Sequence, residues 1–312
     1  MTVKNYKILI IGGCGYIGSR LYQYLKLNNY KVDTLDLEWF GNCVNPQNYK
    51  KNYSDVPKKF FEKYKVIILL AGQSSIKMCE SDHVFAFENN VYNFVKLLEK
   101  LTTQKFIYAS SSSIYGKTNR VNVTENYNQY LPTNYYDLAK KEIDYYAQLS
   151  NINYYGLRLG TVCGHSPNLR NDVMINKMVE TARIGKTINI YNSQVFRPIL
   201  GIEDFCRAIE SVIIKDKPKG IYNLASFNAS VKQVAEQVSG ILKGTRIKNM
   251  GTISGFYNFS VSTKKFERAF NFKFNDSIES IVDSLLNEKP VMKSTREMVK
   301  LSGRFKQLWR LK

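Results

Sequence analysis

The glycine-rich stretch GGCGYIG, at residues 12–18, constrains the fold of this 312-residue chain more than any other feature. It follows the aliphatic run YKILII and precedes apolar residues that recur at helical spacing. A second strand-like run, YKVDTLDL, comes next. A strand, a glycine turn, a helix and a second strand make a βαβ unit, in which the two strands are parallel.

The same alternation continues to about residue 160. Further strand patterns are KVIILLAG, KFIYASSS and NYYGLRLG, and the helical patterns between them are FAFENNVYNFVKLLEKL and YYDLAKKEIDYYAQLS. Alternation of this kind predicts an α/β fold, namely a Rossmann-like doubly wound parallel sheet. Such sheets bind ligands at the carboxyl ends of their strands.

The glycines themselves predict a dinucleotide site. Gly13-x-Gly15-x-x-Gly18 has the fingerprint spacing in the required place, directly after a strand and at the start of a helix. Asp36 ends the second strand, where an acidic residue accepts the ribose hydroxyls and repels a 2′-phosphate, which favours NAD over NADP. The alternatives are a tight turn that merely needs glycine and a solvated aspartate at a strand end.

A tyrosine and a lysine predict the chemistry. Tyr136 and Lys140 are four residues apart and therefore share one face of a helix, where the cation stabilises a phenolate. Ser111 ends an earlier strand, at the same edge of the sheet as the glycine turn, and can hydrogen-bond the hydroxyl that Tyr136 deprotonates. The alternative for the serines is that they only satisfy the loop backbone.

With these motifs the chain resembles the extended short-chain dehydrogenases/reductases, and among them the NAD-dependent nucleotide-sugar epimerase/dehydratase family. Further similar motifs are SSSSIYG, ENNVYNF, LRLGTVCG, FRPILGIEDFCRAI and IYNLAS. The resemblance implies that Ser111, Tyr136 and Lys140 are catalytic. It implies that the NAD-binding residues are Gly12, Gly15, Tyr16, Ile17, Gly18, Asp36, Leu70, Ala71, Gly72, Asn90, Tyr136 and Lys140.

The resemblance also implies a substrate, a nucleotide-diphosphate sugar. Arg197 is expected to bind the diphosphate, and Ser112, Asn171 and Asp172 are the other expected substrate contacts. Dehydratases of the family carry two carboxylates where this chain has serines at positions 112 and 113, so a 4-epimerase with a transient 4-keto intermediate is favoured. A 4-ketoreductase or a dehydratase of the same family stays open, as does a non-catalytic NAD-binding or RNA-binding regulatory protein.

The expected domains follow from these assignments. We expect an NAD-binding Rossmann domain over residues 1–165, to which about 192–225 return, and a smaller C-terminal substrate-binding lobe mainly over 166–286. Residues 287–312 have the pattern of a basic amphipathic tail, which either packs on its own protein or makes peripheral membrane contact.

Composition excludes several other classes of function. The net charge is +19, but the expected folded region has no basic block, so nucleic-acid binding is not expected. The five cysteines form no C-x-x-C pair, so neither a metal site nor a disulfide framework is expected. The chain begins without a signal-peptide pattern, so we expect a cytoplasmic protein, and we expect a homodimer.

Overall fold

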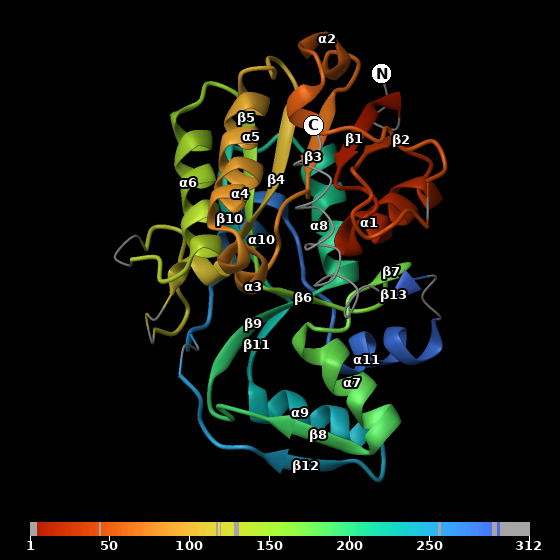
Figure 1. Ribbon diagram of the computed structural model, residues 1–312, viewed down its shortest axis with the longest axis vertical. Helices are drawn as coiled ribbons and strands as arrows, with labels where there is room; N and C mark the ends of the chain where they lie inside the picture. Colours follow the sequence, from red (N-terminus) through yellow and green to blue (C-terminus); the bar gives the residue numbers. More distant parts are fainter. Residues whose placement is uncertain are drawn as a thin grey trace.

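A parallel six-stranded sheet forms the centre of the computed structural model, which describes residues 5–43, 45–116, 118, 120–127, 131–254, 257–288 and 292–293 (Figure 1). Its strands are β1 (Lys7–Ile11), β2 (Lys31–Leu35), β3 (Val66–Leu69), β4 (Lys105–Ser111), β5 (Asn153–Leu159) and β10 (Gly220–Leu224). Their order is β10-β5-β4-β3-β1-β2, and every neighbouring pair is parallel. The predicted Rossmann-like sheet is therefore confirmed, and its strand order reverses at β1, where such sheets bind ligands.

Helices cover both faces of this sheet. Alternate residues of β1 divide between two hydrophobic cores, one with Ile8 and Ile10 and the other with Leu9 and Ile11. The first core contains α1 (Tyr16–Leu27), α8 (Ile202–Ile214) and α10 (Lys264–Phe270). The second contains α2 (Lys58–Phe61), α5 (Asn93–Leu98) and α6 (Tyr135–Leu149). Because both faces of the strands are buried, they read in the sequence as continuous apolar runs.

The segment predicted as one helix over 85–101 is interrupted. It follows α3 (Ile76–Ser81) and forms α4 (His83–Phe87), the π-helical turn η3 (Glu88–Tyr92) and then α5. A π-helical turn inserts an extra residue into a helix and is frequent at functional sites. Here it turns Asn89 and Asn90 inward, where both are buried.

The lobe below the sheet in Figure 1 has its own core. Its strands are β6 (Thr161–Cys163), β9 (Phe196–Gly201) and β11 (Phe227–Ser230) in one sheet, β8 (Thr187–Ile190) with β12 (Arg246–Asn249), and β7 (Asn168–Leu169) with β13 (Met292–Lys293). Three helices pack together beside them, namely α7 (Met174–Gly185), α9 (Val231–Ile241) and α11 (Ile278–Asn287). Within the range 192–225, α8 and β10 lie with the central sheet, whereas β9 pairs with β6 and β11. The domain limits stay a prediction.

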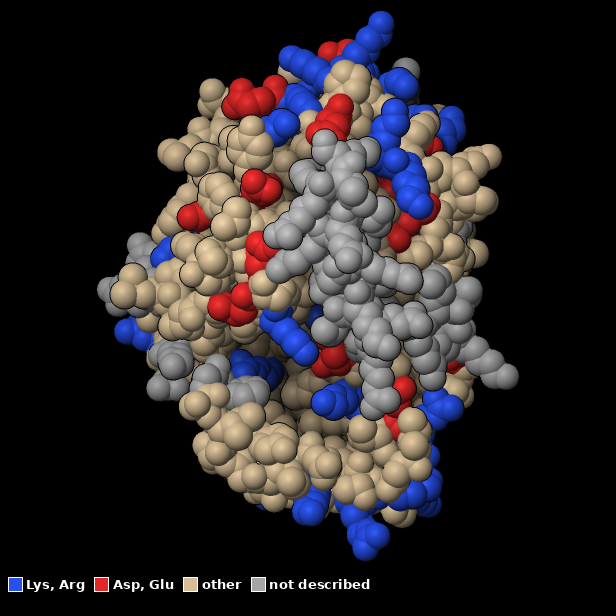
Figure 2. Space-filling view, in the orientation of Figure 1, with Lys and Arg blue, Asp and Glu red and all other residues tan. Residues whose placement is uncertain are grey.

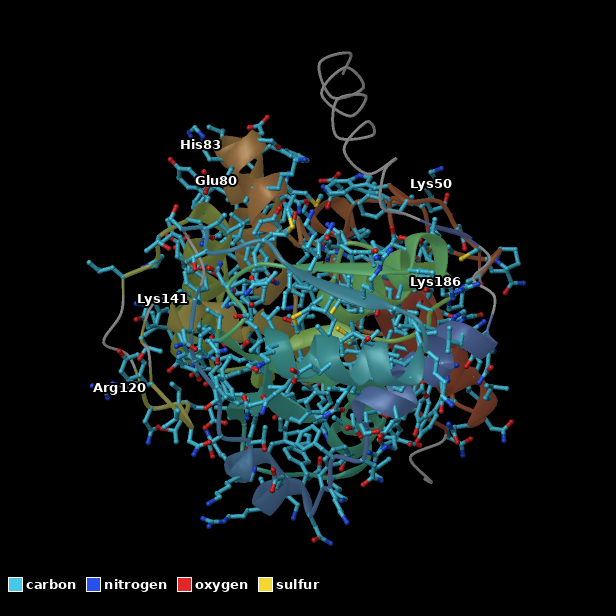
Figure 3. All side chains as sticks on the ribbon, turned by 90° about the horizontal axis from the view of Figure 1, so that it is seen from below. Lys50, Glu80, His83, Arg120, Lys141 and Lys186 are labelled. Atoms are coloured by element: carbon cyan, nitrogen blue, oxygen red, sulfur yellow. The ribbon has the colours of Figure 1, made fainter. Side chains whose placement is uncertain are left out.

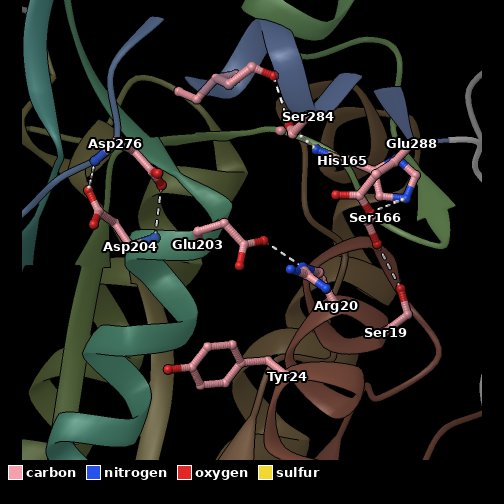
Figure 4. Close-up of polar contacts among 12 residues, drawn as sticks. Ser19, Arg20, Tyr24, His165, Ser166, Glu203, Asp204, Asp276, Ser284 and Glu288 are labelled. Atoms are coloured by element: carbon pink, nitrogen blue, oxygen red, sulfur yellow. Dashed lines mark hydrogen bonds and ion pairs between the residues drawn. The ribbon is translucent and has the colours of Figure 1, made fainter. Parts of the chain in front are cut away.

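Polar contacts tie the glycine-turn helix α1 to the lobe and to α8 of the central sheet (Figure 4). Ser19 and Ser166 share a hydrogen bond of 2.8 Å, and Arg20 forms an ion pair of 2.5 Å with Glu203 of α8. The backbone N–H of His165 donates to Ser284 Oγ of α11 over 3.1 Å. These bonds fix the start of the lobe relative to the carboxyl edge of the sheet.

Candidate active site

A cavity that is open to solvent lies at the carboxyl ends of β1, β2 and β3, with about 950 Å³ of space that includes part of the solvent at its mouth. Its lining comes from the glycine turn, the loop after β2, the loop after β3, Asn89 of η3 and Arg170 of the lobe. The face of the molecule drawn in Figure 2 is hollowed between the sheet and the lobe, and both Lys or Arg and Asp or Glu side chains border the hollow. Two cations, Lys51 and Arg170, line the cavity, and they can attract the phosphate groups of a ligand.

Three glycines of the turn, Gly12, Gly15 and Gly18, differ in what an added side chain would meet. Gly12 has a φ of +88°, and a Cβ there would lie 2.4 Å from the backbone nitrogen of Ala71. A Cβ on Gly18 would lie 2.0 Å from the carbonyl oxygen of Gly12. Gly15 differs, because the nearest atom to its Cβ would be 3.5 Å away, an ordinary contact. The protein's own packing thus requires Gly12 and Gly18, whereas Gly15 leaves room in the cavity that it lines.

The start of α1 adjoins this room. Gly15 is the N-cap residue of α1, and no side chain caps the helix, so its first N–H groups remain available for a phosphate. Tyr16 and Ile17 line the cavity. The Tyr16 hydroxyl donates to the Gly164 carbonyl over 2.8 Å and accepts from Asn176 Nδ2 over 3.1 Å. Tyr16 therefore also fixes the lobe against the glycine turn.

Asp36 lies in the cavity wall at the end of β2. Its Oδ2 accepts from the backbone N–H of Cys14 over 2.9 Å, and its Oδ1 accepts from that of Glu38 over 2.7 Å. Burial raises the pKa of its carboxyl, and the backbone N–H groups act against that rise. Beside it, the apolar side chains of Leu37, Trp39 and Phe40 line the cavity. A carboxylate next to apolar walls suits the ribose and adenine of a dinucleotide.

The loop after β3 closes the next side of the cavity. Leu70, Ala71 and Gly72 all line it. Asn90 holds this loop from behind, because its Oδ1 accepts from the Gln73 N–H over 2.8 Å and its Nδ2 donates to the Gln73 carbonyl over 3.0 Å. Asn90 is thus placed to shape the loop, while its neighbour Asn89 lines the cavity.

Tyr136 and Lys140 lie together on α6, as their spacing predicts. Burial raises the pKa of Tyr136 to about 12, although a hydrogen bond with Ser111 lowers it. Burial lowers the pKa of Lys140 to about 8. The Lys140 Nζ donates to the Ala109 carbonyl over 2.6 Å and lies 6.0 Å from the centre of the Tyr136 ring. The structure therefore brings the phenol, the ammonium and the Ser111 hydroxyl to one place.

The residue before Tyr136 on α6 faces outward. Tyr135 is 43% exposed and stacks on His83, with 4.8 Å between ring centres. Its backbone N–H donates to Glu80 over 3.1 Å. Figure 3 shows Glu80, His83 and Lys141 at the periphery of the molecule. Of the two consecutive tyrosines, Tyr136 is thus the one directed toward Ser111.

The expected substrate residues have mixed surroundings. Ser112 is buried beside Ser111 in the turn η4 (Ser112–Tyr115). Burial lowers the pKa of Arg197 to about 10, and its guanidinium lies 5.9 Å from the ring centre of Tyr257. Asn171 and Asp172 bond within the lobe, since Asn171 Nδ2 donates to Glu180 over 2.9 Å and Asp172 forms an ion pair with Arg170.

Arg170 is a site residue that the sequence did not reveal. Its Nε and Nη2 donate to the two carboxylate oxygens of Asp172, over 2.8 Å and 3.0 Å. Its Nη1 donates to Ser74 Oγ over 3.2 Å, which joins the lobe to the loop after β3. Ser74 and Arg170 both line the cavity. A single arginine in a loop gives no sequence signal, because only the fold brings it to Ser74.

Comparison with known proteins identifies the family. The family model described as "NAD dependent epimerase/dehydratase family" matches residues 8–225. The chain belongs to the NAD dependent epimerase/dehydratase family. It is thus an enzyme of a family that works with NAD, and the glycine turn, the uncapped start of α1 and the cavity fit that cofactor.

Proteins whose names state different activities are similar to this chain, and so is one whose name states none. Protein CapI of Staphylococcus aureus is 29% identical over 234 residues, which are 67% of this chain and 70% of CapI. A dTDP-D-glucose 4,6-dehydratase of Dictyostelium discoideum is 29% identical over 272 residues, 75% of this chain and 62% of that protein. The structure of the UDP-N-acetylglucosamine 4-epimerase of Methanobrevibacter ruminantium M1, in complex with UDP-N-acetylmuramic acid, is similar in fold. It has a TM-score of 0.81 and 20% identity, and the match covers 91% of this chain and 98% of that one.

Two further observations complete the comparison with the sequence. In the part of the chain that the structure describes, no helix is long and apolar enough to cross a membrane, and no group of three or more His, Cys, Asp or Glu residues is arranged to hold a metal ion. The predicted basic tail, with its membrane contact, falls almost wholly on residues 289–291 and 294–312, which lie outside the described residues.

Proposed function

We propose that this protein is an NAD-dependent nucleotide-sugar 4-epimerase. The observation that carries the proposal is the chemistry around Tyr136. Elimination of water needs an acid and a base that touch the sugar, and family dehydratases place carboxylates where this chain has Ser112 and Ser113. The carboxylate near these serines is Asp137, which is 1% exposed and lies behind Ser113 as a hydrogen-bond acceptor. The proposed site therefore presents serine hydroxyl groups and a phenol to the sugar. These groups suit the reversible oxidation of one sugar hydroxyl.

The residues divide the work as follows. NAD, when bound, supplies the chemistry of hydride acceptance and return. Tyr136, as the phenolate, takes the proton of the sugar hydroxyl at its oxygen and later, as the phenol, gives it back. Lys140 keeps a positive charge near that oxygen, and Ser111 holds the hydroxyl in place by a hydrogen bond. Lys140 is itself held by the Ala109 carbonyl.

The other proposed contacts place the rest of the substrate. Arg197 binds the diphosphate with its planar guanidinium, and Ser112 contacts the sugar. Asp172 acts on the ligand through Arg170, which it orients at the cavity, and Asn171 stays a proposed substrate contact. Arg170 is added to the proposed binding residues because it lines the cavity beside Tyr16.

The exposed face of α6 supports a homodimer. Leu138, Tyr145 and Leu149 recur at helical spacing and are 39%, 49% and 84% exposed. Val84 and Phe87 of the adjacent helix α4 are exposed as well. Exposed apolar side chains on adjacent helices are characteristic of a protein interface. We propose that a second copy of the chain covers this face of α6 and α4. Sedimentation analysis of the purified protein tests the proposal, because it shows whether the mass is that of one chain or of two.

The position of Asp36 predicts cofactor preference. The protein is expected to bind NAD at least ~10-fold more tightly than NADP, because a 2′-phosphate beside the Asp36 carboxylate would bring two anions together. Titration of the purified protein with each reduced cofactor, followed by nicotinamide fluorescence, measures the two affinities. Equal or tighter binding of NADP would show that Asp36 does not face the ribose.

A panel of nucleotide sugars tests the proposed reaction. The protein is incubated with each sugar in turn, once with NAD and once with NADH, and the products are identified by mass and NMR. An epimer of unchanged mass is expected for at least one sugar. A product lighter by one water would establish a dehydratase instead, and consumption of NADH with a product heavier by two hydrogens would establish a ketoreductase.

A further inference from the structure

The two-stranded sheet of β8 and β12 in the lobe lies in a stretch of the surface that carries only positive charge. Residues 181–195 and 237–254, which form and flank this sheet, contain no Asp or Glu. Figure 2 shows Lys and Arg side chains at this lower end of the lobe. The cations of the two segments are all exposed and form no ion pair within the described part of the chain; they are Arg183, Lys186, Lys243, Arg246 and Lys248.

The strand pairing shows which side chains point outward from this sheet. Ile188 and Ile190 of β8 are buried in the core that the sheet shares with α7 and α9. Arg246 and Lys248 of β12 pair with positions 187 and 189, on either side of Ile188. Successive side chains of a strand point to opposite faces, so Arg246 and Lys248 lie on the face turned away from the two helices.

Apolar side chains continue this outer face. The Met250 N–H donates to the Ile190 carbonyl over 2.8 Å, which extends the pairing of β12 with β8 and places Met250 opposite Tyr191. Met250 and Tyr191 are each 41% exposed. Ile184, in the last turn of α7, is 80% exposed and precedes Lys186 by two positions. Exposed cations and exposed large apolar side chains therefore lie together on this surface.

The acidic residues of the two covering helices are engaged elsewhere. Helix α7 has one, Glu180, which accepts from Asn171 over 2.9 Å. Helix α9 has one, Glu236, which forms an ion pair of 3.6 Å with Lys232 on the same helix. The outer face of the β8–β12 sheet therefore keeps its positive charge.

We propose that the outer face of the β8–β12 sheet binds an anionic lipid membrane. Lys and Arg side chains are attracted to the negative surface of such a membrane, and apolar side chains between them enter the boundary between headgroups and acyl chains. A nucleic acid would use the cations but would gain nothing from Ile184 and Met250. In Figure 1 this sheet lies at the end of the lobe away from the central sheet, so the contact leaves the cavity accessible.

Sedimentation of the full-length protein with lipid vesicles tests the proposal. The wild-type protein is expected to sediment with vesicles of phosphatidylcholine and phosphatidylglycerol, but not with vesicles of phosphatidylcholine alone. Arg246→Gln combined with Lys248→Gln is expected to weaken this binding by about 25-fold, because each cation near an anionic surface contributes about fivefold. The melting temperature and the NAD affinity of the variant should not change, since both side chains are exposed and lie away from the cavity.

Two exposed lysines at the opposite end of the molecule provide a matched control. Lys58 and Lys59 lie on α2, at the upper end of Figure 1, and are exposed. Lys58→Gln combined with Lys59→Gln removes the same charge and is expected to leave vesicle binding nearly unchanged. Equal losses in the two double variants would show that binding follows net charge alone, which would overturn the proposal.

A third variant separates a membrane from a soluble polyanion. Tyr191→Ser combined with Met250→Ser keeps every charge, and it is expected to weaken vesicle binding by at least about fourfold, the effect of one buried methylene group. If this variant binds the vesicles as tightly as the wild-type protein, the face accepts an anion such as nucleic acid and the membrane proposal is wrong. The proposal also fails if the wild-type protein does not sediment with the anionic vesicles, or if the Arg246→Gln, Lys248→Gln variant sediments equally well.

Discussion

Replacing Tyr136 by phenylalanine is expected to lower kcat by at least ~10²-fold, the usual contribution of a positioned acid/base group. The substitution removes the phenol oxygen that moves the proton and keeps the ring that Lys140 faces at 6.0 Å. NAD affinity should therefore change little. Steady-state kinetics on a converted nucleotide sugar measure the loss, and a cofactor titration of the same variant provides the control.

Ser111→Ala is the matched comparison for Tyr136→Phe. It removes a hydrogen bond to the reacting hydroxyl but leaves the phenol, so the loss of turnover should be smaller. A Tyr136→Phe variant that retains most of its turnover would show that the proton moves through another group. If the two variants lose turnover equally, Tyr136 only positions the sugar hydroxyl and does not transfer its proton.

The second large effect is expected at Gly15. Gly15→Val should weaken NAD binding by at least ~10²-fold, because a branched side chain would occupy the part of the cavity where backbone must approach the pyrophosphate. The fold should survive, since Gly15 has an ordinary φ of −73° and its Cβ would meet protein atoms only at 3.5 Å. Cofactor titration together with a thermal melt separates the two effects.

Gly18→Ala gives the contrasting outcome. Its added Cβ would lie 2.0 Å from the Gly12 carbonyl oxygen, so the melting temperature should fall, with cofactor binding lost only through misfolding. If Gly15→Val binds NAD as tightly as the wild-type protein, the cavity at the glycine turn is not where the dinucleotide binds.

The parts of the fold and the site that local sequence carries were predictable. The glycine turn, the strand ends and the spacing of Tyr136 and Lys140 each depend on residues a few positions apart, and the structure places them as expected. The break at η3 was not predictable, because a π-helical turn keeps the apolar pattern of a helix while adding one residue.

Contacts between segments that are far apart in the chain could not be predicted from the sequence. Arg170 becomes a cavity residue only because the lobe folds back to Ser74, 96 positions earlier in the chain. Asp137 lies beside Tyr136 in the sequence, but its partners Ser113 and Tyr257 come from the end of β4 and from the segment before α10. Asn90 was expected to contact NAD, and its bonds to Gln73 could be seen only once the loop after β3 was placed.

The central claim is that one site oxidises a sugar hydroxyl and reduces the same carbon again, and the fate of the hydrogen on that carbon tests it most directly. A nucleotide sugar that the panel identifies as a substrate is prepared with deuterium at C4 and converted in ordinary water with NAD. The proposed 4-epimerase should yield the C4 epimer with the deuterium still at C4 and the mass unchanged. Loss of the deuterium to solvent or to another carbon, or a product lighter by one water, would contradict the claim.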